Sequence, residues 1–215
     1  MADYIRARSA EHKAERIEEI MNASEKLFSE GSYHNVSLTN IAKELGWSRA
    51  NLYKYVDTKE EIFLALYLKK QEKFVDCLLE KYNGREDVPD EEFSSIWARA
   101  FEENLEYPKY QELQHSILET NVDVDKLADF QRKSNAQREK IYPMIKSKFT
   151  KLDNHEIKNK YLSFLYMASG LYAHTHYYDA AKEAMKLAEV EYQLDEFYPL
   201  MKDFLDMTLY YNKKV

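Results

Sequence analysis

The sequence predicts an all-α protein with a small N-terminal head, residues 1–57, and a larger helical body, residues 58–215. Two observations predict this class. The 215 residues include only four Gly and four Pro, so few positions interrupt a helix. Apolar residues recur with the helical spacing of three and four, and no stretch shows the alternation of a strand. With 45% hydrophobic residues, the chain is long enough to bury a sizeable core.

The head is expected to contain three helices. The first runs from Ala14 to Phe28 on one apolar stripe, and Gly31 is expected to stop it in a left-handed conformation. Ser37 is the predicted cap of a second helix over residues 38–45, which Gly46 ends. Ser48 then caps a third helix that reaches Tyr55, with Trp47 and the apolar side chains around it packing this unit onto the first helix.

The body is expected to begin with a long helix. Thr58 and Glu61 form a capping-box pattern, and the helix that follows should reach about Tyr82. A loop over residues 83–90 comes next. The remaining predicted helices are 90–107, 108–122, 123–149, 154–180 and 194–211, with Pro143 kinking or splitting the third. Residues 181–192 have helix-forming composition but a weaker stripe.

Composition and charge limit the cellular compartment and the classes of binding partner that the sequence allows. The single cysteine, Cys77, excludes an internal disulfide and fits a packed residue in a reducing, cytoplasmic protein. No secretory signal is visible, and the longest uncharged run, residues 161–178, carries too many polar groups for a membrane span. Residues 1–55 have no net charge, whereas the whole chain has a net charge of −7. This distribution permits the head to approach nucleic acid while the body is repelled from it.

Two short helices joined by a tight glycine turn form a helix-turn-helix, and the second helix presents side chains that read bases. Arg49 can bond guanine O6 and N7, Asn51 can bond adenine N6 and N7, and Ala50 can meet a thymine methyl. Phosphate contacts are expected from hydroxyl and ammonium groups nearby. The complete predicted DNA-binding set is Ser37, Thr39, Ser48, Arg49, Ala50, Asn51, Tyr53, Lys54 and Lys59. The alternative interpretation is a solvated helix face.

Between about residues 14 and 67 the sequence carries a further series of residues: Ala23, Leu27 and Phe28, then Gly31, SLTNIA, LG, LYKY and TKEE. In these residues the region resembles the DNA-binding head of the TetR family of bacterial transcriptional regulators. It implies a recognition helix at residues 48–55, phosphate binding by Tyr53 and Lys59, and an anchoring hydroxyl at Ser37. The sequence departs from the family pattern at Trp47, Ala50, Asn51, Val56 and Asp57, so the resemblance does not give the operator sequence.

In this family the C-terminal helices form a two-fold dimer, and the body of this chain suits one. The predicted helix 154–180 is apolar nearly all round, and the last helix carries a second apolar stripe. We expect a homodimer through a four-helix interface, which places two recognition helices about 34–36 Å apart on a palindromic operator. The predicted interface residues are Leu165, Ala168, Leu171, Tyr172, Leu200, Phe204 and Thr208.

The resemblance also implies a small-molecule effector bound in the body. The predicted lining residues are Trp97, Phe101, Tyr107, His115, Tyr142, Tyr166 and His174, with ordinary core packing as the alternative for each. The abundance of tyrosine favours a flat or hydrophobic effector with a few hydrogen-bonding groups. His174 and His176 point about 200° apart on a helix, so they make a poor metal site. We expect no metal and no cofactor.

Three classes of function can be weighed against the sequence: a DNA-binding repressor, a protein-binding adaptor and an enzyme. The leading hypothesis is a DNA-binding repressor whose effector shifts the helix that begins after Thr58 and so releases the operator. The second is a helical adaptor that binds proteins rather than DNA, and the absence of net charge on the head favours it. A mobile basic arm with Arg6, Arg8 and Lys13 would supply the positive charge that DNA binding needs. An enzyme is disfavoured, because no nucleophile–base pair, phosphate-binding glycine loop or metal-ligand spacing is present.

Overall fold

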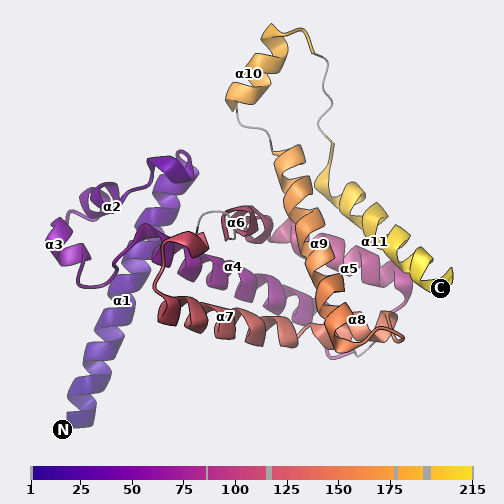
Figure 1. Ribbon diagram of the computed structural model, residues 1–215, viewed down its shortest axis with the longest axis horizontal. Helices are drawn as coiled ribbons and strands as arrows, with labels where there is room; N and C mark the ends of the chain where they lie inside the picture. The colour runs from indigo at the N-terminus through magenta and orange to yellow at the C-terminus, as the bar shows by residue number, and fades with distance from the viewer. Residues whose placement is uncertain (1, 86, 115–117, 177–178, 191–194, 215) are drawn as a thin grey trace. The chain divides into compact units, whose positions relative to one another are not determined.

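A computed structural model describes residues 2–85, 87–114, 118–176, 179–190 and 195–214 of the chain. Within these ranges the structure is all helical, with eleven α-helices, two short 3₁₀ helices and no strand (Figure 1). Contacts divide the chain into two compact units. Unit 1 comprises Met1–Leu68 and Gln114–Gln131, and unit 2 comprises Lys69–Leu113 and Arg132–Val215. The all-α prediction is confirmed.

Unit 1 holds the predicted head. Its elements are α1 (Ala2–Ser29), η1 (Tyr33–Asn35), α2 (Leu38–Glu44), α3 (Arg49–Leu52), the first part of α4 (Lys59–Tyr82), η2 (Leu118–Thr120) and the first part of α7 (Val124–Glu139). The small core beneath α2 and α3 contains Ile41, Leu52 and Val56, all buried as their spacing predicts.

The turn between α2 and α3 follows from three residues. Ser37 and Ser48 cap the two helices, because their side chains accept hydrogen bonds from the backbone N–H groups of Asn40 and Asn51. Gly46 takes a positive φ of 66°. The N–H of Gly46 bonds Lys43 O, and the N–H of Trp47 bonds Ala42 O, at 3.1 and 2.8 Å, which is the Schellman ending of a helix.

Three details of the head differ from the prediction. Gly31 does not take a positive φ; instead a Cβ there would lie 3.1 Å from the Asn35 side chain, so space explains this glycine. The α-helical part of the recognition segment is only Arg49–Leu52, because residues up to Tyr55 continue in tighter turns. The first helix begins at Ala2, twelve residues before the predicted start at Ala14.

Unit 2 holds most of the body. Its complete helices are α5 (Asp90–Glu103), α8 (Tyr142–Lys148), α9 (Asn154–Thr175), α10 (Asp179–Leu187) and α11 (Phe197–Lys214), with most of α6 (Glu106–Gln114). Figure 1 shows α11 running beside α9, and α11 also packs on α5. Pro143 is the second residue of α8, and the chain is split there from α7, as predicted. No described helix combines the length and the apolar character that a bilayer crossing requires.

The division between the units differs from the predicted boundary. The sequence placed the boundary after residue 57, whereas contacts place it after Leu68 and assign Gln114–Gln131 to the first unit. The reason is that α4 and α7 are each continuous helices that contribute residues to both units. The chain therefore passes between the two units three times: within α4, at the last residue of α6 and within α7.

Candidate functional site

The recognition face is formed by α3 and the turn after it. Leu52 is completely buried and anchors the helix, so the residues around it face outward. The guanidinium of Arg49 lies 5.9 Å from the ring centre of Tyr53 and donates a hydrogen bond to its hydroxyl at 3.3 Å. Both side chains, with Ser48, Ala50 and Lys54, are exposed; Asn51 is half-buried. The structure therefore presents the predicted base-reading residues to solvent on one short element.

Lys59, a predicted phosphate ligand, is partly turned toward the protein. Its ammonium donates to the backbone carbonyls of Tyr33 and Val36 at 3.0 and 2.9 Å, and lies 3.9 Å from the centre of the Tyr33 ring. Burial lowers the pKa of Lys59 below its ordinary value. An ammonium has three donors, so one remains for a phosphate oxygen after the two carbonyls are satisfied.

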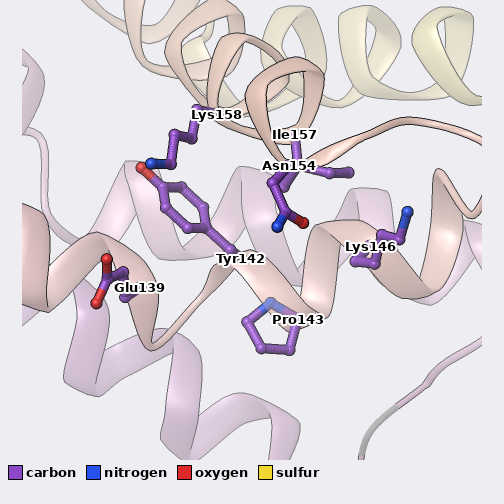
Figure 2. Close-up of a pocket in the computed structure, with 7 residues that line it drawn as sticks. All are labelled: Glu139, Tyr142, Pro143, Lys146, Asn154, Ile157 and Lys158. Carbon is purple, nitrogen blue, oxygen red and sulfur yellow. The ribbon is translucent and has the colours of Figure 1, made fainter.

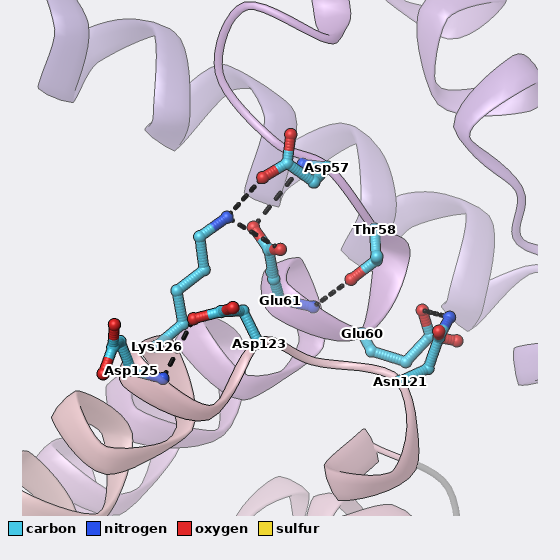
Figure 3. A network of polar contacts seen from close by, with 8 residues as sticks. All are labelled: Asp57, Thr58, Glu60, Glu61, Asn121, Asp123, Asp125 and Lys126. Atoms are coloured by element: carbon cyan, nitrogen blue, oxygen red, sulfur yellow. Dashed lines mark hydrogen bonds and ion pairs between the residues drawn. The ribbon is translucent and has the colours of Figure 1, made fainter.

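A polar network joins the start of α4 to the start of α7 within unit 1 (Figure 3). The Lys126 ammonium contacts carboxylate oxygens of Asp57 at 2.5 Å and of Glu61 at 2.9 Å. These two hydrogen-bonded carboxylates raise the pKa of Lys126. The Lys126 cation thus neutralises part of the acidic charge beside the recognition element.

Glu60 extends the network into the interior of unit 1. Its carboxylate is buried and accepts hydrogen bonds from the Tyr33 hydroxyl at 2.7 Å and from the Asn121 side chain at 3.2 Å. Burial and the bond to Glu60 raise the pKa of Tyr33. Because Tyr33 also holds Lys59, the segment before α7 is linked to a predicted DNA ligand through two hydrogen bonds and one ring contact.

Sequence reasoning missed Tyr33, Asn121 and Lys126. Lys126 and Asp57 are separated by 69 positions, and Asn121 and Glu60 by 61. Helical periodicity identifies which face of a helix is buried but not which distant element covers it. The one local signal was the capping pattern at Thr58, whose hydroxyl does accept the Glu61 N–H at 3.3 Å.

Within the described residues, the predicted effector residues lie in different surroundings. Trp97 and Phe101 are completely buried and pack against other rings of the unit 2 core. Tyr166 is 48% exposed, and the exposed His174 ring pairs with Asp195 at 3.0 Å. His115 lies outside the described residues. Tyr107 and Tyr142 do line cavities.

The cavity beside Tyr142 lies between the end of α7, α8 and the start of α9 (Figure 2). Its volume is about 430 Å³. The walls combine apolar surface from Pro143 and Ile157 with the charged groups of Lys146, Lys158 and others. Figure 2 shows the Tyr142 ring crossing the cavity with its hydroxyl directed toward the Lys158 ammonium. A concave surface that combines apolar and polar walls in this way is typical of small-molecule binding sites.

The predicted dimer residues divide into two groups. Leu165 and Ala168 are 1% and 0% exposed within the single chain, so they pack inside the protomer and are corrected. Leu171, Tyr172, Leu200, Phe204 and Thr208 are half-buried. The same two helices, α9 and α11, also expose large apolar side chains that the prediction did not include: Tyr166, Met207, Tyr210 and Tyr211.

Among the described residues, no group of three His, Cys, Asp or Glu side chains is arranged to hold a metal ion. Cys77 is half-buried, and its thiol donates to the Glu103 carboxylate at 3.4 Å. Burial raises the pKa of this thiol, which favours the protonated form. A protonated thiol is a weak nucleophile and a weak metal ligand.

Comparison with known proteins finds a matching family model for each of the two parts of the chain. Residues 20–66 match the family model for bacterial regulatory proteins of the tetR family. Residues 69–210 match the model for the tetracyclin repressor-like C-terminal domain. The boundary between the two matches falls on α4, where the contact division also lies.

Individual relatives match over a short segment of the chain. An uncharacterised HTH-type transcriptional regulator of Mycobacterium tuberculosis is 38% identical over 60 residues, which are 28% of this chain and 28% of that protein. The fatty acid metabolism regulator protein of Bacillus subtilis is 29% identical over 62 residues, which are 29% of this chain and 32% of that protein. The matched segment therefore spans about a third or less of these relatives.

Solved structures resemble the whole chain. A transcriptional regulator of the TetR/AcrR family from Thermobifida fusca has a TM-score of 0.54 at 18% identity, covering 89% of this chain and 97% of its own. The fatty acid degradation regulator FadR from Bacillus halodurans has a TM-score of 0.51 at 16% identity, covering 90% and 94%. Such low identities show a shared fold. Together with the two family models, they establish that this chain belongs to the TetR family and is a DNA-binding transcriptional regulator.

Proposed function

We propose that this protein is a repressor that reads a palindromic operator as a dimer and releases it when a small molecule binds in the body. The observation that carries the DNA-reading part is the exposed pair of Arg49 and Tyr53 on the capped turn of α3. Stacking on the Tyr53 ring pre-orders the guanidinium, so less side-chain entropy is lost when it bonds a guanine. The nearby hydroxyls and cations supply phosphate contacts.

The experiment that tests DNA reading is the selection of binding sites from random duplexes with the purified full chain. A repressor of this kind enriches one inverted repeat, and its affinity falls steeply with salt because phosphate contacts release counterions. The competing function is a helical adaptor, favoured by the uncharged head. An adaptor gives neither an enriched sequence nor a salt slope, and that result would exclude operator reading.

Lys59→Ala is expected to weaken binding to every duplex sequence and to reduce the salt slope by about one. The substitution removes a phosphate ligand, and it also removes the cation that bonds the carbonyls of Tyr33 and Val36. Fluorescence anisotropy at several salt concentrations measures both quantities. Lys186→Ala, at an exposed position on α10 in the other unit, is the matched control and should leave the slope unchanged. A sequence-selective loss in Lys59→Ala would contradict a phosphate role.

The proposed dimer uses the outer faces of α9 and α11. Tyr166, Met207, Tyr210 and Tyr211 are 48–61% exposed there, and a contact between two protomers would cover these large apolar side chains. A two-fold contact through these faces provides the pair of recognition helices that an inverted repeat requires. Sedimentation at micromolar concentration tests this; a monomer under those conditions would oppose it.

We propose that the effector signal reaches the head along α7 as well as α4. Both helices contribute residues to both units. Lys126 in the first turn of α7 holds Asp57 and Glu61, and Glu139 at its last position lines the cavity of Figure 2. A ligand that displaces the end of this helix acts on the helix whose first turn holds the start of α4. An effector that binds tightly without changing operator affinity would exclude this route.

Lys126→Ala is expected to weaken operator binding about two-fold, because two carboxylates near the recognition element lose their cation. One uncompensated charge repels a DNA phosphate at ~10 Å in water by ~0.4 kcal/mol before screening by salt. Asp57→Asn in the same chain should restore most of the affinity, since it removes one of the uncompensated charges. Anisotropy titrations of the single and double variants measure this. If Asp57→Asn fails to restore binding, the contribution of Lys126 is not electrostatic.

A further inference from the structure

The interior of unit 2 contains a cluster of polar side chains, which we name the buried polar cluster: Gln71, Tyr107, Ser134 and Tyr161, together with Arg138, whose Nε is shielded from solvent one helical turn after Ser134. Gln71 and Ser134 are 0% and 1% exposed. The Gln71 amide nitrogen donates to the Tyr107 hydroxyl and to the Ser134 carbonyl, both at 3.3 Å. The Tyr107 and Tyr161 hydroxyls are 2.7 Å apart. Four helices, α4, α6, α7 and α9, thus direct polar groups toward one place.

Several atoms of the cluster have no hydrogen-bond partner. These are the Gln71 Oε1, the Ser134 Oγ and the Arg138 Nε, all of which are shielded from solvent. The orientation of the Gln71 amide is fixed, because the Ser134 carbonyl accepts only from the nitrogen side. Arg138 lies one helical turn after Ser134 and therefore on the same face of α7. Leaving such groups unpaired is costly in the interior of a protein, so each needs an explanation.

Aromatic rings pack against the two tyrosines of the cluster, and Tyr107 also lines a cavity. The Phe74 ring lies 5.2 Å from that of Tyr107, and the Tyr142 ring meets that of Tyr161 edge to face at 6.0 Å. Tyr142 lines the cavity of about 430 Å³ in Figure 2, and Tyr107 lines another of about 210 Å³. Burial raises the pKa of Tyr142, and the positive charge of Arg138 opposes that rise.

We infer that the buried polar cluster is the polar half of the effector site, and that the effector is an uncharged, flat molecule whose polar group both donates and accepts hydrogen bonds. This inference rests on the proposed function, since it assigns a ligand class to the effector. Gln71 Oε1 needs a donor, and Arg138 Nε needs an acceptor. A primary amide offers both from one planar group, and the aromatic rings cover the flat remainder of the ligand.

Charged ligands would leave some hydrogen-bonding atoms of the cluster without a suitable partner. A carboxylate offers only acceptors, so it would leave Gln71 Oε1 facing another acceptor. An ammonium offers only donors and would place a second cation beside Arg138, with no carboxylate among the five residues of the cluster to balance it. Benzamide, benzoate and benzylamine have similar size and differ in this property, so they separate the three classes.

The first test uses stability without any ligand. Ser134→Ala removes an unpaired buried hydroxyl and is expected to raise the Tm of the full chain by about 2–4 °C. Ser169→Ala is the matched control, because its buried hydroxyl bonds the carbonyls of Pro108 and Leu165 at 3.1 and 3.0 Å. That variant should lower the Tm. A lower Tm for Ser134→Ala would show that the hydroxyl is already paired, for example with a buried water, and would overturn the inference.

The second test uses the three probes, with titration calorimetry on the wild-type chain and on Gln71→Met and Ser134→Ala. Benzamide is expected to bind the wild-type chain, at least ten-fold tighter than benzoate or benzylamine, and to lose at least ten-fold in affinity in Gln71→Met. Ser169→Ala should keep wild-type affinity. No binding of benzamide, a preference for a charged probe, or equal binding by Gln71→Met would each overturn the assignment.

Duplex binding by the same proteins separates this inference from the proposed function. Gln71→Met and Ser134→Ala should bind the selected duplex as the wild-type chain does when no probe is present, since neither residue belongs to unit 1. If the wild-type chain binds no duplex selectively, the proposed function fails whatever the probes do. If it binds the duplex and the probes fail as described, only the ligand assignment is wrong.

Discussion

Trp97→Ala is expected to lower the free energy of unfolding by about 3–5 kcal/mol, the range for removing a large buried ring. Trp97 is completely buried, and its ring lies 5.6 Å from Phe93 and 5.5 Å from Phe164. Its indole N–H donates to the Tyr82 hydroxyl at 3.2 Å. The substitution therefore leaves a cavity among aromatic rings and an unpaired buried hydroxyl at the end of α4.

Urea unfolding followed by circular dichroism measures this loss. Trp97→Phe is the matched variant: it keeps much of the ring volume and loses the hydrogen bond to Tyr82, so its cost should be clearly smaller. Fluorescence of Trp47, which lies in unit 1, reports separately on the head. A loss below about 1 kcal/mol for Trp97→Ala would contradict a role for this ring in the core, since such small values are typical of surface positions.

Local chemistry made the head predictable. The caps at Ser37 and Ser48, the positive φ of Gly46 and the burial of Ile41, Leu52 and Val56 all follow from residues close to one another in the chain. Each of these features depends on backbone geometry within a few residues, so a residue type at one position is enough to indicate it. The separation of α7 from α8 at Pro143 was predictable for the same reason.

Long-range pairing was not predictable in the same way. The contacts of Lys126 with Asp57 and of Gln71 with Ser134 join helices far apart in the sequence. An apolar stripe also does not reveal what covers it, because a helix buried within one chain and a helix buried between two chains carry similar patterns. This is why Leu165 and Ala168 were assigned to a dimer interface although they pack inside the protomer.

Arg49→Ala is expected to weaken binding to the selected operator by about 1–3 kcal/mol, or roughly 5- to 150-fold, and to relax the preference at one base pair in each half-site. Its guanidinium is exposed, is positioned by the Tyr53 ring and hydroxyl, and lies on the capped turn of α3. A bidentate contact to guanine explains a sequence-selective effect, whereas a contact to phosphate would weaken all duplexes equally.

Anisotropy titrations against the selected duplex and against duplexes changed at single base pairs distinguish these two outcomes. Arg99→Ala is the matched control, because Arg99 is also an exposed arginine that lies over a tyrosine ring, at 3.6 Å from Tyr198, but belongs to unit 2. It changes the net charge of the chain equally and should leave operator binding unaltered. If both substitutions weaken binding alike, the effect of Arg49 is one of total charge, and α3 does not read the base pair assigned to it.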